Sequence, residues 1–285
     1  MSCELGENPN HPTCPRDAQG CVTQGTPLHW ASSCLNYAVQ LDGSPRSQLD
    51  ADQIQALAEQ AFLVWKTAQC PGGGSPEFDV HFQGYVSCDR AEAVCGSADV
   101  NVNVLMFHDS DWPYGSGDVG VTTPTGGTAS GLVVDTDVEI DSQLFGFKSD
   151  ASGMMKTSLL YTLAHEFGHF LGLAHSRVPG ALMTPVYQSL PVSQNPLSAD
   201  DTAAICSAFP PGPALGCAAA STPAYDTCRY AVGEQLPKCD LASLTQDASG
   251  CGCELAASSS RRPTGSSIAA LSVLLGALVR RRRVR

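Results

Sequence analysis

The sequence lacks several features that would place it in a familiar class of protein. No Cys-x-x-Cys pair occurs among its 13 cysteines, which disfavours a structural zinc knuckle. Basic residues are scarce: outside 261–285, which holds seven Arg and no acid, nine Lys and Arg stand against 28 Asp and Glu. This acidic body argues against a nucleic-acid partner, and it suits either simple solubility or the binding of divalent cations.

The N-terminal residues also lack the apolar run of a signal peptide. Yet 13 cysteines spread along the chain are typical of disulfide bonds formed in an oxidising compartment. We therefore expect a secreted or outer-surface protein, with an export signal encoded upstream of Met1. Cys88 and Cys95 are spaced to pair across a short loop, but spacing alone leaves the pairing open.

Composition and periodicity divide the chain into four parts. Residues 1–25 are polar and Cys-bearing and predict an irregular lead-in, whereas 26–210 carries alternating and helical apolar patterns. In that second part the order strand, helix, three strands, helix, loop, helix predicts an α+β domain. Residues 211–260 are rich in Ala, Ser, Pro, Gly and Cys and predict a disulfide-tethered linker, and 261–285 forms a separate tail.

Two of the predicted helices begin at recognisable caps. Asp50 is a good N-cap with Gln53 three residues later, the spacing of a capping box, and Ser198 with Asp201 repeats that spacing. The long helix between them carries the apolar residues of 159–171 at helical spacing.

The last predicted strand has one apolar and one acidic face. It follows a Gly-, Ser- and Thr-rich connection, 115–131, and alternates Val, Thr and Ile with Asp135, Asp137 and Glu139. Two interpretations of these carboxylates stay open: a solvated strand face, which is the simpler, or a calcium site.

A pair of histidines marks the strongest motif. His165 and His169 are four residues apart, so on a helix they lie on one face, one turn above the other. Two imidazoles at that spacing can grip one tetrahedral ion. Glu166 follows the first histidine directly, where a carboxylate can handle the proton of a water without binding the metal.

The third histidine of the motif requires a break in the helix. On a continued helix His175 would lie about 9 Å beyond His169 and on another face. Gly172 stands between them, and glycine takes left-handed backbone angles at little cost. The sequence therefore predicts that the chain turns back at Gly172 and presents His175 to the same ion.

These eleven residues resemble the long zinc motif of the metzincins, which pair it with a downstream Met-turn. The run Ala-Leu-Met-Thr-Pro-Val-Tyr looks like that turn, with Met183 eight residues after His175. Ser176 and this run resemble the matrixin branch, because Pro185 stands where astacins and serralysins place a Tyr. The resemblance covers 26–210.

The resemblance implies a metzincin-like twisted mixed sheet with an active-site helix, a Met-turn and a C-terminal helix. It also implies a zinc-dependent endopeptidase that hydrolyses extracellular proteins with one catalytic Zn²⁺ and a water activated by it. Substrate is expected to add as a strand at the sheet edge 118–123. The resemblance implies that the zinc ligands are His165, His169 and His175, and that Glu166 is the general base and acid. It also implies that Met183 forms an apolar floor beneath the imidazoles and that Tyr187 and Pro185 wall the specificity pocket.

The sequence departs from the matrixin pattern in two respects. No Pro-Arg-Cys-Gly-Val-Pro-Asp cysteine-switch motif occurs, so latency by a cysteine on the zinc is not expected. The family's second, structural zinc needs several His and an Asp between 100 and 140. Only His108 stands there among the histidines, and we predict no such zinc.

The tail combines an apolar run, 266–279, with terminal arginines. The run is shorter than the ~20 residues that span a bilayer comfortably. With the preceding Cys-Gly-Cys at 251–253, the tail resembles the C-terminal sorting tags of myxobacterial surface proteins. That resemblance implies processing at the cysteines and anchoring at a membrane or the cell surface.

Two functions of different classes stay open. The first is a monomeric zinc endopeptidase acting on protein or peptide substrates. The second is a non-catalytic surface-binding module on a metzincin fold. The presence of Glu166 and Met183 with all three histidines favours the enzyme, because a relic without turnover usually loses the Glu or a His.

Overall fold

The computed structural model describes residues 26–93, 101–127, 130–145, 147, 159–185, 197–214, 216–217 and 227–229. The chain divides into two units, Met1–Leu255 and Ala256–Arg285, and every described residue belongs to the first. The predicted lead-in, most of the linker, the tail and Tyr187 lie outside the described residues. In the part that is described, no helix is long and apolar enough to cross a membrane.

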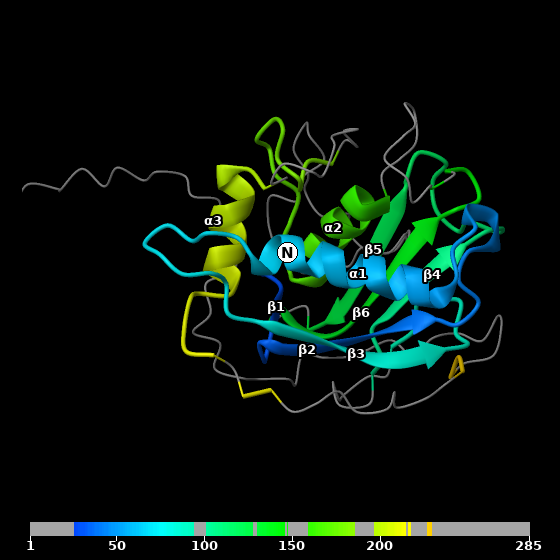
Figure 1. The fold of residues 1–285 in the computed structure, drawn as a ribbon, viewed down its shortest axis with the longest axis horizontal. Helices are drawn as coiled ribbons and strands as arrows, with labels where there is room; N and C mark the ends of the chain where they lie inside the picture. The colour runs from blue at the N-terminus through cyan, green and yellow to red at the C-terminus, as the bar shows by residue number, and fades with distance from the viewer. Residues whose placement is uncertain are drawn as a thin grey trace, which may run out of the picture. The chain divides into compact units, whose positions relative to one another are not determined.

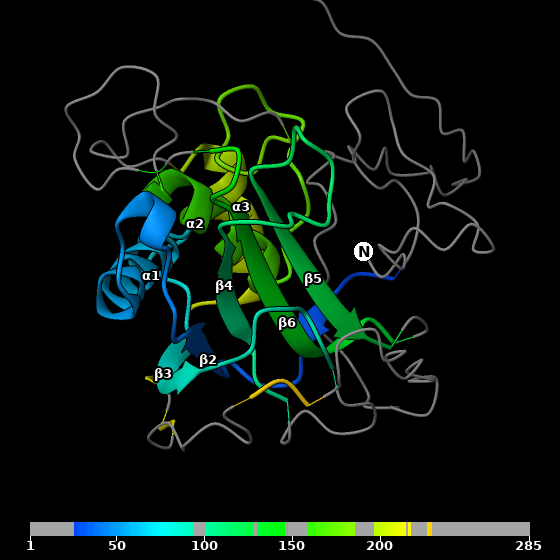
Figure 2. The same ribbon diagram turned by 90° about the vertical axis from the view of Figure 1, so that its right-hand side faces the viewer.

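A six-stranded sheet forms the centre of the fold (Figure 1). Five strands run parallel in the order β1-β6-β4-β2-β3, and β5 pairs antiparallel with β6. Figure 2 shows β5 at the opposite side of the sheet from β3. The strand bounds are β1 His29–Trp30, β2 Cys34–Gln40, β3 Asp79–Val86, β4 Val104–His108, β5 Gly120–Gly126 and β6 Leu132–Asp141.

The mixed sheet with three helices confirms the predicted α+β fold. Strand β5 overlaps the stretch 118–123, which was expected to be a sheet edge but was not counted among the predicted strands. Its residues lie inside the stretch 115–131 that was assigned to a connection, because Gly120, Pro124 and Gly126 all have low strand propensity. Proline is tolerated at a sheet edge, where its missing N–H costs no ladder bond. This segment therefore forms a strand because it pairs with β6, and not because its residues favour strand structure.

The helices begin where the caps predict. Helix α1 (Ala51–Lys66) starts after Asp50, and α3 (Ala199–Ala208) starts after Ser198, each with a complete capping box. Helix α2 spans Leu159–Phe170. A single 3₁₀ turn, Pro45–Ser47, precedes α1.

The main core lies between the sheet and the helices α1 and α2. The rings of Phe62 on α1 and Phe167 on α2 stack with centroids 3.8 Å apart. The buried Trp65 indole of α1 donates to the Ala164 carbonyl of α2 at 2.8 Å. This contact fixes α2, which carries the histidine pair, against α1.

The acidic face of β6 is buried, which corrects the expectation of a solvated strand face. Asp135, Asp137 and Glu139 are each no more than 2% exposed. A second, smaller apolar cluster lies beside them, built around Val104 and Met106 of β4, together with Ala38, Val86, Cys88 and Val102. The alternation along the strand was predicted correctly. The burial was not, because coverage of a face depends on distant parts of the chain.

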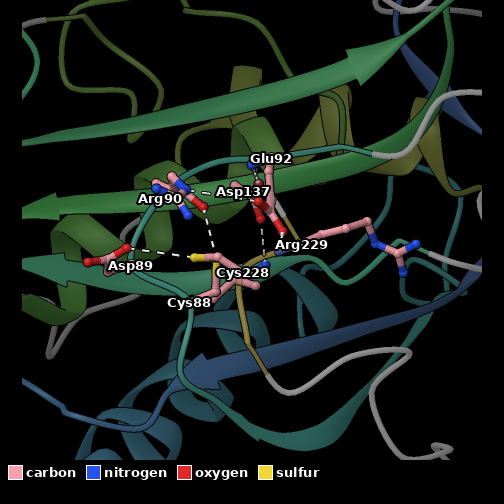
Figure 3. The surroundings of a disulfide bond; sticks show 8 residues. Cys88, Asp89, Arg90, Glu92, Asp137, Cys228 and Arg229 are labelled. Carbon is pink, nitrogen blue, oxygen red and sulfur yellow. Dashed lines mark hydrogen bonds and ion pairs between the residues drawn. A yellow bond between two sulfur atoms is a disulfide. The ribbon is translucent and has the colours of Figure 1, made fainter. Parts of the chain in front are cut away.

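Among the described residues, three disulfide bonds join segments that lie far apart in the sequence. Cys88 pairs with Cys228, so the proposed Cys88–Cys95 pair is wrong (Figure 3). The other two bonds are Cys34–Cys217 and Cys70–Cys206. The bonds to Cys217 and Cys228 attach the start of the 211–260 segment to β2 and to the segment that follows β3.

Candidate metal centre and active site

The end of α2 takes the form that the glycine predicted. Gly172 has φ of 92°, in the left-handed region. Its N–H bonds to the His169 carbonyl and the N–H of Leu173 bonds to the Gly168 carbonyl, both at 2.9 Å, which is the Schellman pattern. The Trp30 indole donates to the carbonyl of Phe170, the last residue of α2, at 2.7 Å. The helix thus ends between the second and third histidines.

The three histidines converge. The ring centroids of His165 and His169 are 4.9 Å apart. The ring centroid of His175 lies 5.4 Å from that of His165 and 4.6 Å from that of His169. One ring nitrogen of each lies within 4.8 Å of the others. The structure therefore brings together the three residues that sequence spacing nominated.

Hydrogen bonds prepare two of these imidazoles to bind a metal. Nδ1 of His165 lies 2.7 Å from the Leu182 carbonyl, and Nδ1 of His169 lies 2.8 Å from the Leu173 carbonyl. A carbonyl only accepts, so each Nδ1 carries the proton and each Nε2 keeps its lone pair. Burial, with the neighbouring imidazoles of His175 and His165, holds the pKa of His169 well below its usual range. A neutral imidazole is the form that ligates a metal.

These donors fit zinc. Three imidazoles, two of them with a backbone carbonyl behind Nδ1, leave a fourth tetrahedral position for water or substrate, as catalytic zinc sites do. Two other groups of potential ligands occur among the described residues, around Cys217 and Cys228. Both of those cysteines are in disulfide bonds, so neither group can offer a thiolate.

Glu166 lies beside the histidines and is buried. Its Oε2 accepts a hydrogen bond from the hydroxyl of Thr122 on β5 at 2.7 Å. Burial raises the pKa of Glu166, while His165 and the Thr122 hydrogen bond oppose that shift and Asp118 adds to it. The carboxyl is thus held in a site where its proton affinity is tuned by several neighbours.

Met183 packs beneath α2. It is 1% exposed, and a Cβ placed on Gly168 would come within 2.2 Å of its sulfur. The backbone around it is tied to α3, because the Asp201 carboxylate accepts from the N–H groups of Leu182 and Met183 at 2.8 Å and 3.1 Å. The sequence identified Asp201 only as a helix cap. Its second role depends on a contact between segments that no local pattern reveals.

A cavity of about 410 Å³ opens over the three histidines and Glu166. Pro185, which the resemblance implied as a wall of the specificity pocket, is among the residues that line this cavity, while Tyr187 lies outside the described residues. Asp118 to Thr122, which also line it, fall within the expected sheet edge 118–123. Other lining residues had no signal in the sequence: Leu28 before β1, Gly117, Pro124 on β5, and Tyr161 and Thr162 on α2. Their positions follow from sheet register and helix packing, for which the sequence carries no local signal.

A second cluster of titratable groups lies on the opposite face of the sheet. Asp137 accepts from the backbone N–H of Glu92 at 2.9 Å and of Val104 at 2.8 Å. Figure 3 shows Glu92 and Asp137 close to the Cys88–Cys228 bond. In the part of the chain that the structure describes, neither oxygen of Asp135 has a hydrogen-bond partner.

Burial raises the pKa of Asp135 and of Asp137, and the negative charges of neighbouring acids add to both shifts. Among the described residues, no three acidic ligand atoms of this face lie close enough together to hold an ion. The geometry gives no support to the calcium alternative.

Comparison with known proteins bears on the cluster formed by the three histidines and Glu166. A family model described as Matrixin matches residues 29–209. Matrilysin of Mus musculus is 28% identical over 177 residues, which cover 62% of this chain and 57% of that protein. Neutrophil collagenase of Homo sapiens is 28% identical over 180 residues, covering 63% and 33%.

A shorter match, with 41% identity over 96 residues, is to matrix metalloproteinase-27 of Tupaia belangeri and covers 34% of this chain and 18% of that protein. In each case the matched segment is less than two thirds of the relative's own length.

Proposed function

This chain belongs to the matrixin family, whose members are zinc metalloendopeptidases, and we propose that it hydrolyses internal peptide bonds. The observation that carries the proposal is the convergence of three imidazoles on one point with a buried carboxylate beside them. That arrangement supplies both a metal site and a group that moves protons.

In the proposed site His165, His169 and His175 hold the zinc through one ring nitrogen each. A bound zinc ion supplies a Lewis acid that polarises the scissile carbonyl and stabilises the charge developing on its oxygen. The carbonyls behind His165 and His169 keep the ring tautomers in the form that leaves Nε2 free. Met183 provides an apolar floor under the helix that carries the first two ligands.

Glu166 is the proposed general base and acid. Its carboxylate takes a proton from the attacking water as the water oxygen bonds to the carbonyl carbon. It then gives that proton to the amide nitrogen as the C–N bond breaks, so the products are a carboxylate and an amine. The raised pKa that burial confers on Glu166 suits a group that must both accept and return a proton near neutral pH.

The proposed substrate is an extended segment of a protein or peptide. Strand β5 lies at one edge of the sheet and borders the cavity, and among the described strands it pairs with β6 alone, so a substrate strand can add to its other side. Tyr161, Thr184 and Pro185 line the same cavity and are the proposed walls of the specificity pocket, with Tyr187 a further proposed wall.

We propose that the protein works outside the cell, on extracellular proteins. The three long-range disulfide bonds support this location, because such bonds persist in oxidising compartments. The sorting or anchoring role of 251–285 is part of the same proposal and rests on the sequence resemblance alone.

A peptide-library digestion tests the function. The full chain is used, because Cys34 and Cys88 are bonded to residues beyond 210. We expect cuts at internal peptide bonds that a zinc chelator abolishes and added Zn²⁺ restores. Binding of peptides without any chelator-sensitive cleavage would instead favour a non-catalytic surface-binding module.

A further inference from the structure

We propose that strand β5 positions the Glu166 carboxylate, with Thr122 as the positioning residue and Gly120 as the space that admits the side chain. The inference depends on the proposed peptidase function, since it concerns how Glu166 is held for proton transfer.

Sheet register explains why these two residues meet Glu166. Thr122 pairs with Val138 of β6, and Gly120 pairs with Ile140. Both β6 partners belong to the core between sheet and helices, so their β5 neighbours face the same side, toward α2. Thr122 is 7% exposed, so its hydroxyl faces the helix and not solvent.

The Thr122 hydroxyl selects one carboxylate oxygen. It lies 2.7 Å from Oε2 of Glu166 and 3.1 Å from the backbone carbonyl of the same residue. A hydroxyl has one proton, and the shorter contact to a carboxylate is the stronger one. The hydrogen bond thus engages Oε2, and Oε1 is the oxygen that we assign to the proton of the attacking water.

Gly120 closes the other side of the carboxylate. A Cβ built on Gly120 would lie 2.9 Å from both Cγ and Oε1 of Glu166. Gly120 is not among the residues with positive φ, so its backbone does not require glycine. The absence of a side chain at Gly120 leaves room for the Glu166 side chain, and any larger residue at position 120 would displace the Glu166 carboxylate.

The first test compares Thr122→Val with Thr122→Ser in the full chain. Valine keeps the shape and removes the hydroxyl, so we expect kcat to fall by about 10- to 100-fold with KM nearly unchanged. Serine keeps the hydroxyl and should restore most of the lost kcat. Thr125→Val, on the same strand but outside the cavity lining, is the matched control and should retain full activity.

Two readouts separate positioning from a loss of structure. Zinc affinity, measured by chelator competition, should be the same in Thr122→Val and wild type. A crystal structure of metal-free Thr122→Val should show the Glu166 carboxylate moved from its wild-type rotamer. Gly120→Ala provides a second, independent variant, in which the steric clash should lower kcat while zinc still binds.

The proposal is overturned if Thr122→Val keeps kcat within twofold of wild type, or if Thr122→Ser loses as much as valine does. It is also overturned if the metal-free variant keeps the wild-type Glu166 rotamer. These outcomes differ from failure of the proposed function, in which wild-type protein itself shows no chelator-sensitive cleavage.

Discussion

The two faces of the sheet each bury a carboxyl group, and the two groups are held differently. Glu166 on the helix face accepts a hydroxyl hydrogen bond and lies beside three imidazoles in a cavity. Asp135 on the other face has no hydrogen-bond partner for either oxygen among the described residues. Burial raises the pKa of both. A raised pKa therefore does not identify a functional carboxyl, whereas an adjoining cavity and a specific partner do.

The comparison also separates two uses of burial. On the helix face, burial lowers the pKa of His169 and raises the pKa of Glu166 beside it. On the other face, burial leaves Asp135 with an uncompensated cost in its charged form. We therefore expect substitutions on the helix face to change turnover and those on the other face to change stability.

The sharpest test of this division pairs Glu166→Gln with Asp135→Asn. Loss of the general base should lower kcat by about 10²- to 10⁴-fold while zinc still binds. Asp135→Asn should leave kcat unchanged, because that side chain is remote from the cavity lining. Peptide hydrolysis and metal content measure both. Near wild-type turnover in Glu166→Gln would refute the assignment of the base.

Among changes on the sheet face that carries Asp135, removal of the Cys88–Cys228 bond should lower stability the most. We expect Cys88→Ser with Cys228→Ser to lower the free energy of unfolding by about 2–5 kcal/mol. The folded variant should keep wild-type kcat, which denaturant unfolding and peptide assays at low temperature would check. A loss of kcat in fully folded protein would show that the two faces are coupled.

Asp201→Asn should affect both properties, because Asp201 joins α3 to the segment that carries Met183. The amide has one acceptor oxygen where the carboxylate accepts three backbone N–H groups. We expect a loss of about 1–3 kcal/mol in unfolding free energy, with a smaller fall in kcat/KM. Asp200→Asn, whose carboxylate accepts from the Ser176 hydroxyl, is the control, and an equal loss there would deny Asp201 a special role.

The smallest expected effect is a change in pH dependence. Asp135 and Asp137 have pKa values raised above 3.8 in the folded protein, so between the unfolded and folded pKa values the folded state binds more protons. Stability therefore falls as pH rises through that window, by up to about 1.4 kcal/mol per pH unit for each proton difference. Asp135→Asn should flatten this slope, as urea unfolding between pH 5 and 8 would show. An unchanged slope would mean that Asp135 is charged in the folded state.

Much of the site was predictable because its geometry is local. Helical spacing places His165 and His169 on one face, and Gly172 ends the helix in the way its backbone freedom allows. The capping boxes at Asp50 and Ser198 depend on contacts three residues apart. Short-range sterics and hydrogen bonds settle all of these features, so they can be recognised in a single sequence.

The sequence by itself thus determined the histidine cluster, the starts of α1 and α3, the end of α2 and the alternation of β6. Only the tertiary structure decided that Thr122 meets Glu166, that Cys88 pairs with Cys228, and that the acidic face is buried. The reason is physical: each of these contacts joins residues at least 40 positions apart or depends on which segments cover a face. Sheet register and packing bring such residues together, and no local pattern encodes them.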